Sequence, residues 1–281
     1  MGVLFVVATP IGNLEDISPR ALRTLRDASL IAAEDTRRTR NMLRHFGIDT
    51  PLASYHAHSP VRRRETILAA LAEGDVALVS DAGTPGVSDP GADLVAAALA
   101  AGHQVSPIPG PSAVAAAVSA SGLVTGPYVF AGFPPRKGAD RGRFLAGLAA
   151  SGMPVVLFEA ANRTAATLAD LAAAFGDRPG VVARELTKLH EEIRPGTLGE
   201  LARRAAAIEP RGEVVIVVGG ASPESTRDVD DEEIVRMVAA RRREGMSLSA
   251  AAREVAAETG RSRSEVYDLE RRAEGESNRS D

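Results

Sequence analysis

Three loops rich in glycine and proline carry the residues best suited to form one ligand site. They span residues 9–14, 80–86 and 109–113, and each follows a short apolar run. Glycine allows close approach of the backbone and unusual dihedral angles, while proline stiffens a loop and exposes carbonyl oxygens. One such loop is an ordinary tight turn. Three of them at the carboxyl ends of neighbouring strands predict a binding site.

The loops also restrict the kind of ligand. Neither a Gly-x-x-x-x-Gly-Lys-Ser/Thr run nor a Gly-x-Gly-x-x-Gly run follows a predicted strand, so the loops suit a polyphosphate poorly. Main-chain groups held by glycine and proline suit a flat adenine and a methionine tail. The sequence therefore favours a ligand of that kind.

Metal chemistry is not predicted. The chain has no cysteine, which removes thiolate ligands and disulfides together. His56 and His58 stand two residues apart and would share a face of an extended segment, but no further ligands lie near them in the sequence. We expect these histidines in a surface loop or at a contact with RNA.

The elements that must position the loops alternate between strands and helices in the first half of the chain. The short apolar runs predict buried strands at 3–8, 30–33, 76–80 and 104–108. A capping residue followed by proline predicts the start of a helix at Ser18, Ser59 and Asp89. Helix ends are expected at Gly47, Gly74 and Gly102. The alternation predicts a largely parallel sheet covered on both faces, in an α/β domain of residues 1–122.

The second half repeats this alternation. Strands are predicted at 155–158, 181–183 and 214–218, with a helix at 162–175 that ends at Gly176. The loop-rich stretch 121–135 separates the two periodic regions. We therefore predict a second α/β domain of residues 123–222.

The end of the chain has a different character. An acidic run from Asp228 precedes three short helical patterns, whose apolar faces are Ile234, Met237 and Val238, then Leu248, Ala252 and Val255, then Val266 and Leu269. Ser262 and Glu265 have capping-box spacing, and a turn is expected at Thr259 and Gly260. This pattern predicts a helix-turn-helix unit at residues 228–275. A helical tail that packs on the second domain or on a partner subunit is an equal alternative.

Composition places further limits on function. The 281 residues carry 33 basic and 37 acidic side chains, for a net charge of −4, so contacts with nucleic acid require local basic patches. The apolar run at the N-terminus is stopped by Pro10 too early to be a secretory or membrane-spanning segment. We expect a soluble, cytoplasmic protein with no membrane partner.

Five strings of residues give the chain a family resemblance. They are Ala8 to Leu14, Ala33 to Arg37, Leu78 to Pro85, Pro109 to Ser112 and Ala183 to Lys188. These strings closely resemble a family of bacterial 16S ribosomal RNA 2'-O-methyltransferases within the tetrapyrrole-methylase superfamily. The likeness runs from about residue 3 to the C-terminal helices. The Gly-Pro loops are shared across the superfamily, whereas Pro-Ile-Gly-Asn, Ala-Glu-Asp-Thr-Arg and Arg-Glu-Leu-Thr-Lys are more specific.

The resemblance implies a fold, a cofactor and a substrate. The fold is a pair of α/β domains with S-adenosylmethionine in the cleft between them, usually in a homodimer. The substrate is the ribose 2'-hydroxyl of a cytidine, position 1402, in the 16S RNA of the small ribosomal subunit. By matching motif, the donor-binding residues are Pro10, Ser80, Asp81, Ala82, Gly83, Thr84, Pro85, Ser112, Ala113, Phe158, Leu186 and Thr187.

Methylation of a ribose hydroxyl requires a base, because the hydroxyl is a poor nucleophile while it keeps its proton. The candidates are Glu34, Asp35, His56, His58, Asp81, Glu185 and Lys188. We favour Lys188, with Asp35 and Glu185 as further catalytic candidates, because a partly desolvated lysine can act as a base where arginine cannot. Two alternatives stay open. Lys188 would instead contact an RNA phosphate or pair with Glu191 or Glu192, and Asp35 would instead cap a helix.

Basic residues are placed to follow an RNA backbone around the site. The predicted RNA contacts are Arg37, Arg40, Arg44, His56, His58, Arg136 and Lys137, and Arg141 and Arg143 lie near the last two. Each run alone is equally a solvated helix face. Aromatic residues make up 4% of the chain, so phosphate and shape recognition should outweigh base stacking.

Two other functions fit parts of the sequence. A tetrapyrrole C-methyltransferase would share the Gly-Pro loops, but it has no evident use for the helical unit and the basic clusters. A non-catalytic, ribosome-associated RNA-binding factor would use the helix-turn-helix and keep the α/β domains as a scaffold. Fold alone does not separate these functions.

Overall fold

The protein is described here by a computed structural model, which forms two compact units, Met1–Gly220 and Ala221–Asp281. The residues that the structure describes are 2–208, 211–221, 230–243, 245–259 and 261–277. Some predicted features lie outside the described residues. They are the domain boundaries at 222 and 228, the start of the acidic run at Asp228 and Val229, and the turn residue Gly260. No described helix is both long and apolar enough to span a membrane.

The first sheet of the larger unit is parallel throughout and has the order β3-β2-β4-β1-β5. Its strands are β1 (Val3–Val7), β2 (Leu30–Ala33), β3 (Leu52–Ser54), β4 (Val76–Val79) and β5 (Gln104–Ile108). The predicted parallel sheet is confirmed, and β3 is an edge strand that the prediction lacked. Because β4, β1 and β5 are neighbours, the three Gly-Pro loops that follow them meet at one edge of the sheet.

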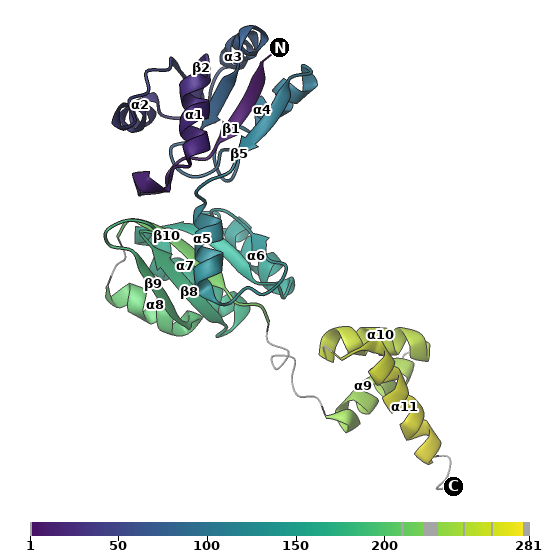
Figure 1. Cartoon of the computed structure of the whole chain (residues 1–281). Coiled ribbons are helices and arrows are strands. Elements are labelled where there is room, and N and C mark those ends of the chain that lie inside the picture. The colour runs from purple at the N-terminus through teal and green to yellow at the C-terminus, as the bar shows by residue number, and fades with distance from the viewer. Residues whose placement is uncertain (1, 209–210, 222–229, 244, 260, 278–281) are drawn as a thin grey trace. The chain divides into compact units, whose positions relative to one another are not determined.

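Four helices cover both faces of this sheet (Figure 1). They are α1 (Pro19–Asp27), α2 (Thr36–His45), α3 (Val61–Glu73) and α4 (Ala92–Ala100). Leu25 of α1 and Leu43 of α2 join the core on one face, while Leu71 of α3 and Leu94 of α4 join the core on the other. Burial on both faces explains why the strands appear in the sequence as continuous apolar runs.

The helix starts confirm one predicted cap and correct two. The hydroxyl of Ser18 accepts a hydrogen bond from the first turn of α1, as predicted. The hydroxyl of Ser59 instead accepts from the N–H of His56, and α3 begins without a side-chain cap. Asp89 does not cap α4, because the chain enters that helix through Gly91 with a φ of +132°. The predicted helix ends are confirmed at or just before Gly47, Gly74, Gly102 and Gly176.

The second sheet has the order β6-β7-β10-β8-β9. Its strands are β6 (Val129–Phe130), β7 (Val155–Ala160), β8 (Pro179–Arg184), β9 (Glu192–Thr197) and β10 (Glu213–Val218). The second α/β fold is confirmed, but this sheet is mostly antiparallel, unlike the first. The difference arises because a hairpin joins β8 to β9, and β10 then enters between β7 and β8, antiparallel to both. The edge strands β6 and β9 were not predicted.

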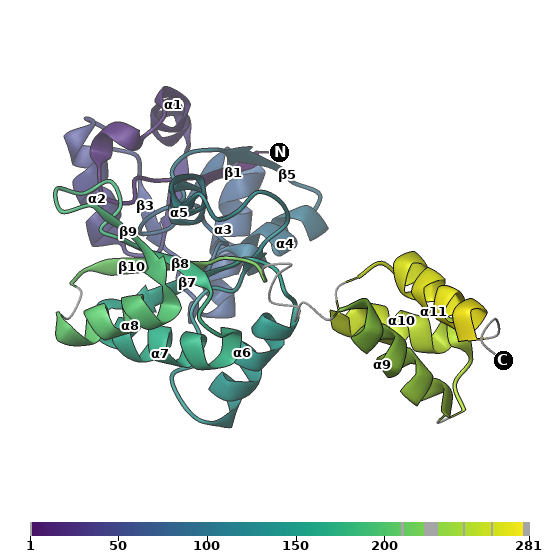
Figure 2. The same cartoon turned by 90° about the horizontal axis from the view of Figure 1, so that it is seen from below.

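Helices cover the two faces of the second sheet unequally. Figure 2 shows α6 (Ala139–Ala150), α7 (Thr164–Phe175) and α8 (Leu198–Ala207) in a row along one face, with α5 (Ala113–Ser121) along the other. Alternate residues of β8 serve the two faces. Val182 packs in the core beneath α7 and α8, whereas Val181 and Ala183 pack with α5. Short 3-10 turns lie at Leu14–Asp16 and Ala161–Arg163.

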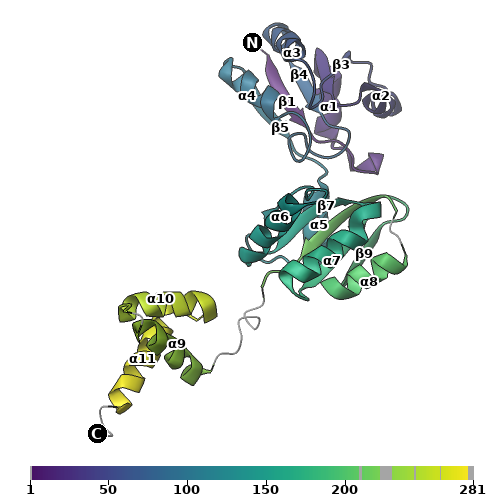
Figure 3. The ribbon, with the colours of Figure 1, turned by 180° about the vertical axis from the view of Figure 1, so that it is seen from behind.

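The smaller unit is a cluster of three helices, α9 (Asp231–Arg243), α10 (Leu248–Thr259) and α11 (Arg263–Ser277), packed together in Figure 3. Its core contains Ile234, Val238, Val255 and Val266, which are the predicted apolar faces. The predicted capping box is confirmed, because the backbone N–H of Ser262 donates to the Glu265 carboxylate and the Ser262 hydroxyl accepts from the Glu265 N–H.

A buried polar network ties the second sheet to its helices. The Glu159 side chain on β7 is fully buried and accepts hydrogen bonds from Arg163 Nε at 2.7 Å and from the hydroxyl of Thr167. Arg141 of α6 donates to the same hydroxyl at 3.0 Å and to Asp170 at 2.7 Å. The network therefore fixes α6 and α7 against β7. A buried carboxylate is tolerated here because each oxygen has a partner.

We predict that Glu159→Ala lowers the free energy of unfolding by about 3–5 kcal/mol, because it leaves Arg163 and Thr167 without their shared acceptor. Urea denaturation measures this change. Asp140→Ala is the control, because it removes a carboxylate of α6 whose ion pair with Arg143 is exposed on both sides, and it should cost about 1 kcal/mol or less. Equal losses in the two variants would contradict a special role for the buried carboxylate.

Candidate functional site

A cavity of about 400 Å³ opens where the three Gly-Pro loops meet. The loops after β1, β4 and β5 contribute Ile11, residues 82–84 and residues 112–114 to its lining. The second sheet contributes the opposite wall, which includes Phe158 and residues 212–215. The volume lies in the range of sites for small molecules and cofactors.

Hydrogen bonds between the loops hold the first wall in place. The N–H of Thr9 donates to the carbonyl of Gly83 over 2.8 Å, and the N–H of Gly83 donates back over 3.0 Å. The hydroxyl of Thr84 lies 3.4 Å from the carbonyl of Pro111. Gly83 has a φ of +76°, which a residue with a Cβ rarely adopts. The loops thus form one connected surface through main-chain contacts.

Aromatic rings form part of the opposite wall. Phe133 and Phe158 both line the cavity, and their ring centroids lie 5.5 Å apart. Phe158 also meets the ring of Phe130 edge to face at 5.0 Å. Phe133 is 58% exposed, so its ring can cover a flat ligand without rearrangement of the core.

The charged residues that line the cavity are all acidic within the described part of the chain. They are Asp89, Glu159 and Glu213. Glu159 pairs with Arg163 and Glu213 with Lys188, whereas no ion pair of Asp89 exists among the described residues. The lining therefore favours a cationic ligand and disfavours a phosphate.

Asp89 has an unusual environment. Burial raises the pKa of its carboxyl to about 6, and the nearby charges of Glu34 and then Asp81 add to this effect, while a hydrogen bond with Ser80 opposes it. Two negative charges beside Asp89 thus disfavour the ionised form of its carboxyl. A positive charge in the cavity would relieve that repulsion.

Lys188 lies in a polar cluster beside the cavity. Its ammonium donates to Glu185 over 2.9 Å and to Glu213 over 3.0 Å. Partial burial lowers the pKa of Lys188, but the hydrogen bonds and charges of the two carboxylates outweigh this and raise the pKa above the ordinary lysine value. The alternative pairing with Glu191 or Glu192 is not the one observed. The contacts hold Lys188 in its protonated form.

Glu185 is held in its ionised form by the same cluster. A hydrogen bond from the N–H of Glu213 lowers the pKa of Glu185, and the hydrogen bond from Lys188 lowers it further. The N–H of Glu185 in turn donates to the carbonyl of Glu213 over 3.0 Å. These reciprocal bonds fix the ends of β8 and β10 against each other.

The segment that carries Lys188 has a strained backbone. Glu185 and Thr187 have φ values of +51° and +66°, which residues other than glycine rarely adopt. Gly12 packs so closely here that a Cβ would lie 2.5 Å from Cγ of Lys188. The hydroxyl of Thr187 is buried, with no hydrogen-bond partner among the described residues. Strain and an unpaired hydroxyl are both features of ligand sites.

The predicted donor-binding residues fall into two groups. Those that line the cavity are Ala82, Gly83, Thr84, Ser112, Ala113 and Phe158. Those outside its lining are Pro10, Ser80, Asp81, Pro85, Leu186 and Thr187. Several of the second group support the first, since the carbonyl of Ser80 accepts from the Thr9 hydroxyl and Leu186 packs against Ile11 in one core cluster.

Asp35 and Arg37 lie at the start of α2 and do not line the cavity. Asp35 caps the helix, accepting from the N–H of Arg37 over 2.8 Å, which is the structural alternative considered for it. The hydrogen bonds from Arg37 lower the pKa of Asp35. Asp81 accepts from the N–H of Asp35 and pairs with Arg38, so it joins the loop after β4 to α2.

The predicted RNA-binding residues lie on exposed segments. Arg40 and Arg44 are exposed on α2, and Arg136 and Lys137 are exposed in the loop before α6. His56 and His58 are exposed in the loop that follows β3, as expected for a surface loop, and the segment is not extended there. The N–H of His58 donates to Nδ1 of His56 within a turn that follows β3.

Arg141 is not available to RNA, because it is buried in the network with Asp170 and Thr167. No group of three metal-ligating side chains occurs among the described residues.

Sequence reasoning missed Asp89, Phe133 and Glu213 as parts of the site. Asp89 was read as a helix cap because proline follows it. Phe133 precedes Pro134 and Pro135 in a stretch read only as a linker. Glu213 directly precedes the apolar run 214–218, which was predicted only as a strand. A charged residue in that place is the signal that could have identified Glu213, whereas no comparable signal marks Asp89 or Phe133.

Family models match both units. A model described as Tetrapyrrole (Corrin/Porphyrin) Methylases matches residues 3–202. A model described as the RsmI C-terminal HTH domain matches residues 228–270, in agreement with the predicted helix-turn-helix.

Relatives and solved structures agree with these matches. "Ribosomal RNA small subunit methyltransferase I" of Synechocystis sp. is 45% identical over 96% of this chain and 97% of its own length. The protein of the same name from Xylella fastidiosa is 46% identical over 95% of this chain and 98% of its own length. The structure of cobalt precorrin-4 methyltransferase has a TM-score of 0.59 at 18% identity, over 77% of this chain and 94% of its own. The chain therefore belongs to the tetrapyrrole (corrin/porphyrin) methylase family and, within it, to the ribosomal RNA small subunit methyltransferase I family.

Proposed function

We propose that this protein is a methyltransferase that uses S-adenosylmethionine to methylate the RNA of the small ribosomal subunit. The observation that carries the proposal is the acid-lined cavity between the Gly-Pro loops and the second sheet. Its lining combines apolar and main-chain groups with the carboxyl of Asp89. The donor, when bound, supplies an electrophilic methyl group on a positively charged sulfur.

The cavity residues fit such a donor part by part. Ala82, Gly83 and Ala113 offer main-chain groups at which a flat adenine can lie, and the rings of Phe133 and Phe158 can cover it. Asp89 offers a negative charge to a sulfonium or ammonium group.

The acceptor is proposed to be the ribose 2'-hydroxyl of a cytidine in 16S ribosomal RNA. This assignment is supported by the name shared by the relatives and by the Arg-Glu-Leu-Thr-Lys string, which forms the polar cluster around Lys188. The precorrin methyltransferase structure is 18% identical to this chain and supports only the fold. Tetrapyrrole methylation is therefore the weaker alternative.

Lys188, Glu185 and Glu213 are proposed to contact the acceptor. A protonated Lys188 can donate hydrogen bonds to the ribose, but it can accept a proton only after it has lost its own. The proposed base role for Lys188 therefore requires that turnover rise with pH as the ammonium deprotonates. Asp35, the other catalytic candidate, has contacts that place it at the start of α2 rather than in the cavity.

The protein is further proposed to act in the cytoplasm, where ribosome assembly supplies the RNA, and as a homodimer, as the family resemblance implies. The helix-turn-helix unit is proposed to add RNA affinity. A relative of the same name in Thermotoga maritima is matched over 99% of its length by only 78% of this chain. That relative is shorter, which supports a catalytic unit that does not require the whole chain.

The proposed function is tested by incubating the purified protein with methyl-labelled S-adenosylmethionine and small ribosomal subunits that lack the modification. Label is expected in the RNA, at a ribose 2'-oxygen located by nuclease mapping. Label in a porphyrinogen and none in RNA would support the tetrapyrrole alternative. A chain that binds no donor by calorimetry would be a non-catalytic factor.

Donor affinity should depend on the ionisation of Asp89. Because the pKa of Asp89 is raised to about 6, the carboxylate forms as the pH rises through that value, and a cationic donor should then bind more tightly. We expect the Kd for the donor to fall roughly fivefold between pH 5 and 7 in calorimetry, if the bound cation lowers this pKa by about one unit. Asp89→Asn should bind weakly at both pH values. A wild-type pH dependence retained in Asp89→Asn would assign the effect to another group.

Lys188→Ala should lower kcat about 100-fold or more while the Kd for the donor changes less than about threefold. Rates at saturating donor and RNA, together with calorimetry, measure the two effects. In the wild type a base role gives a kcat that rises with pH throughout pH 7–9. A flat profile would assign Lys188 to positioning, and unchanged turnover in the variant would remove it from the site.

Removal of residues 221–281 should weaken binding to small subunits and leave donor binding unchanged, since the cavity is lined entirely from the larger unit. Filter binding and calorimetry compare the shortened and full chains. Equal RNA affinity in the two chains would give the helix-turn-helix unit a structural role instead.

A further inference from the structure

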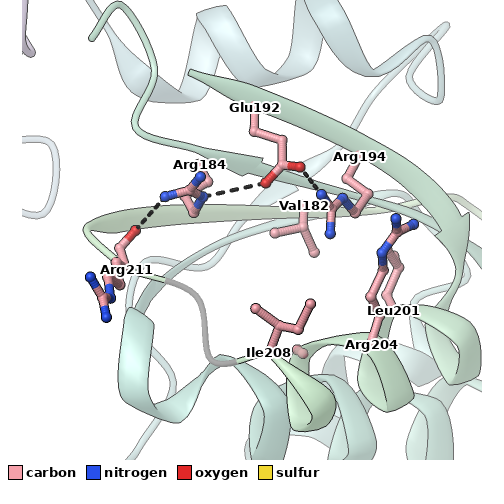
Figure 4. A pocket seen from close by; sticks show the side chains of 9 residues that line it. Val182, Arg184, Glu192, Arg194, Leu201, Arg204, Ile208 and Arg211 are labelled. Carbon is pink, nitrogen blue, oxygen red and sulfur yellow. Dashed lines mark hydrogen bonds and ion pairs between the residues drawn. The ribbon is translucent and has the colours of Figure 1, made fainter. Parts of the chain in front are cut away.

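A second cavity, of about 690 Å³, lies on the α8 face of the second sheet and is lined by arginines. Arg184 on β8, Arg194 on β9 and Arg204 on α8 contribute guanidinium groups, and Arg211, just before β10, lies at the margin with its guanidinium directed outward (Figure 4). This arginine pocket has an apolar floor of Val182, Leu201 and Ala205, and Ile208 lies across the opening from Val182.

The arginine pocket has more positive charge than its own residues balance. Glu192 is the single carboxylate in the lining, and it pairs with both Arg184 and Arg194. Arg204 and Arg211 have no side-chain partner among the described residues. Partial burial lowers the pKa of Arg194, and repulsion from Arg204 and Arg184 lowers it further. An anion in the pocket would remove this repulsion.

The arginine pocket adjoins the donor cavity through the ends of β8 and β10. Arg184 directly precedes Glu185, and Arg211 is separated from Glu213 only by Gly212, which lines the donor cavity. Nη1 of Arg184 donates to the carbonyl of Arg211 over 3.2 Å, next to the reciprocal bonds of Glu185 and Glu213. If the target ribose binds by Lys188, as proposed above, phosphates of the same strand can reach the arginines at this end of the sheet.

We propose that the arginine pocket binds backbone phosphates of the substrate RNA beside the target nucleotide. This inference rests on the proposed function. Guanidinium groups match phosphate geometry, and the apolar floor with Ile208 can receive the face of an unstacked base. With a net charge of −4, the whole protein does not attract RNA, so a local pocket of this kind is needed to hold the strand.

The test uses the full-length double variant Arg204→Gln/Arg211→Gln, which removes the two arginines without side-chain partners. Binding of unmethylated small subunits is measured by filter binding at several KCl concentrations. Loss of two single-strand phosphate contacts should make the slope of log K against log salt shallower by about 1.4 and raise the Kd roughly tenfold near 0.1 M salt. The Kd for the donor should stay unchanged, because neither arginine lines the donor cavity.

The matched control is Arg23→Gln/Arg26→Gln, which neutralises two exposed arginines of α1. Arg26 and Arg204 both lie in the last turn of their helices, so the effect on the helix dipole is the same in control and variant. The charge-retaining Arg204→Lys/Arg211→Lys variant should recover most of the salt dependence. Recovery of RNA affinity in the lysine variant would show that the glutamine variant lost positive charge and not its folded structure.

Three results would overturn the inference. The first is RNA affinity in the glutamine variant equal to that of the control, and the second is a lysine variant as weak as the glutamine variant. The third is a change in oligomeric state on size exclusion that accounts for the loss, which would make the pocket an interface between two copies of the chain. A wild-type protein that methylates no ribosomal RNA would instead contradict the proposed function itself.

Discussion

The antiparallel pairing of β8 with β10 is the constraint on which the rest of the site depends. It sets Arg184 opposite Val214, and it brings the next residues, Glu185 and Glu213, within reach of each other's backbone. Because side chains alternate along a strand, one pairing creates two different surfaces at the same sheet end. One surface is acidic and faces the Gly-Pro loops, and the other is rich in arginine and faces α8.

The two surfaces suit the two ligands of the proposed reaction, a cationic methyl donor and a polyanionic RNA. A cationic donor and a polyanionic acceptor must approach the same point, yet each is repelled by the environment that suits the other. Placing the two environments on opposite sides of one strand end lets both ligands be attracted to it. The cluster of Lys188 with Glu185 and Glu213, which contains both signs of charge, lies at the boundary.

The sequence predicted the parts of the fold that depend on local pattern. Buried strands such as β1 and β4, and the cap of α1 by Ser18, follow from apolar runs and capping residues. The direction of β10 could not be read in this way, because a strand of five buried residues looks the same in parallel and antiparallel sheets. The short edge strand β6 contains only two residues and has no periodicity to detect.

The sequence predicted only the part of the site that is built from the main chain of the Gly-Pro loops. Glycine and proline reveal loops such as 80–86 because their backbone preferences are strong. Asp89 and Arg204 could not be assigned in advance, because an acidic residue before proline and an arginine on a helix each have common structural uses. Tertiary packing decides which of them faces a cavity: for Asp89 it is the packing of the Gly-Pro loops against the second sheet, and for Arg204 the packing of α8 on that sheet.

The left-handed backbone at Glu185 and Thr187 has a consequence for protein engineering. A glycine at either position would relax this strain, which costs on the order of 1 kcal/mol per residue. The same change would delete the carboxylate that holds Lys188 or the hydroxyl that is left unpaired at the site. The strain at these two positions is therefore tied to groups of the proposed site, and it cannot be relieved by glycine without the loss of one of them.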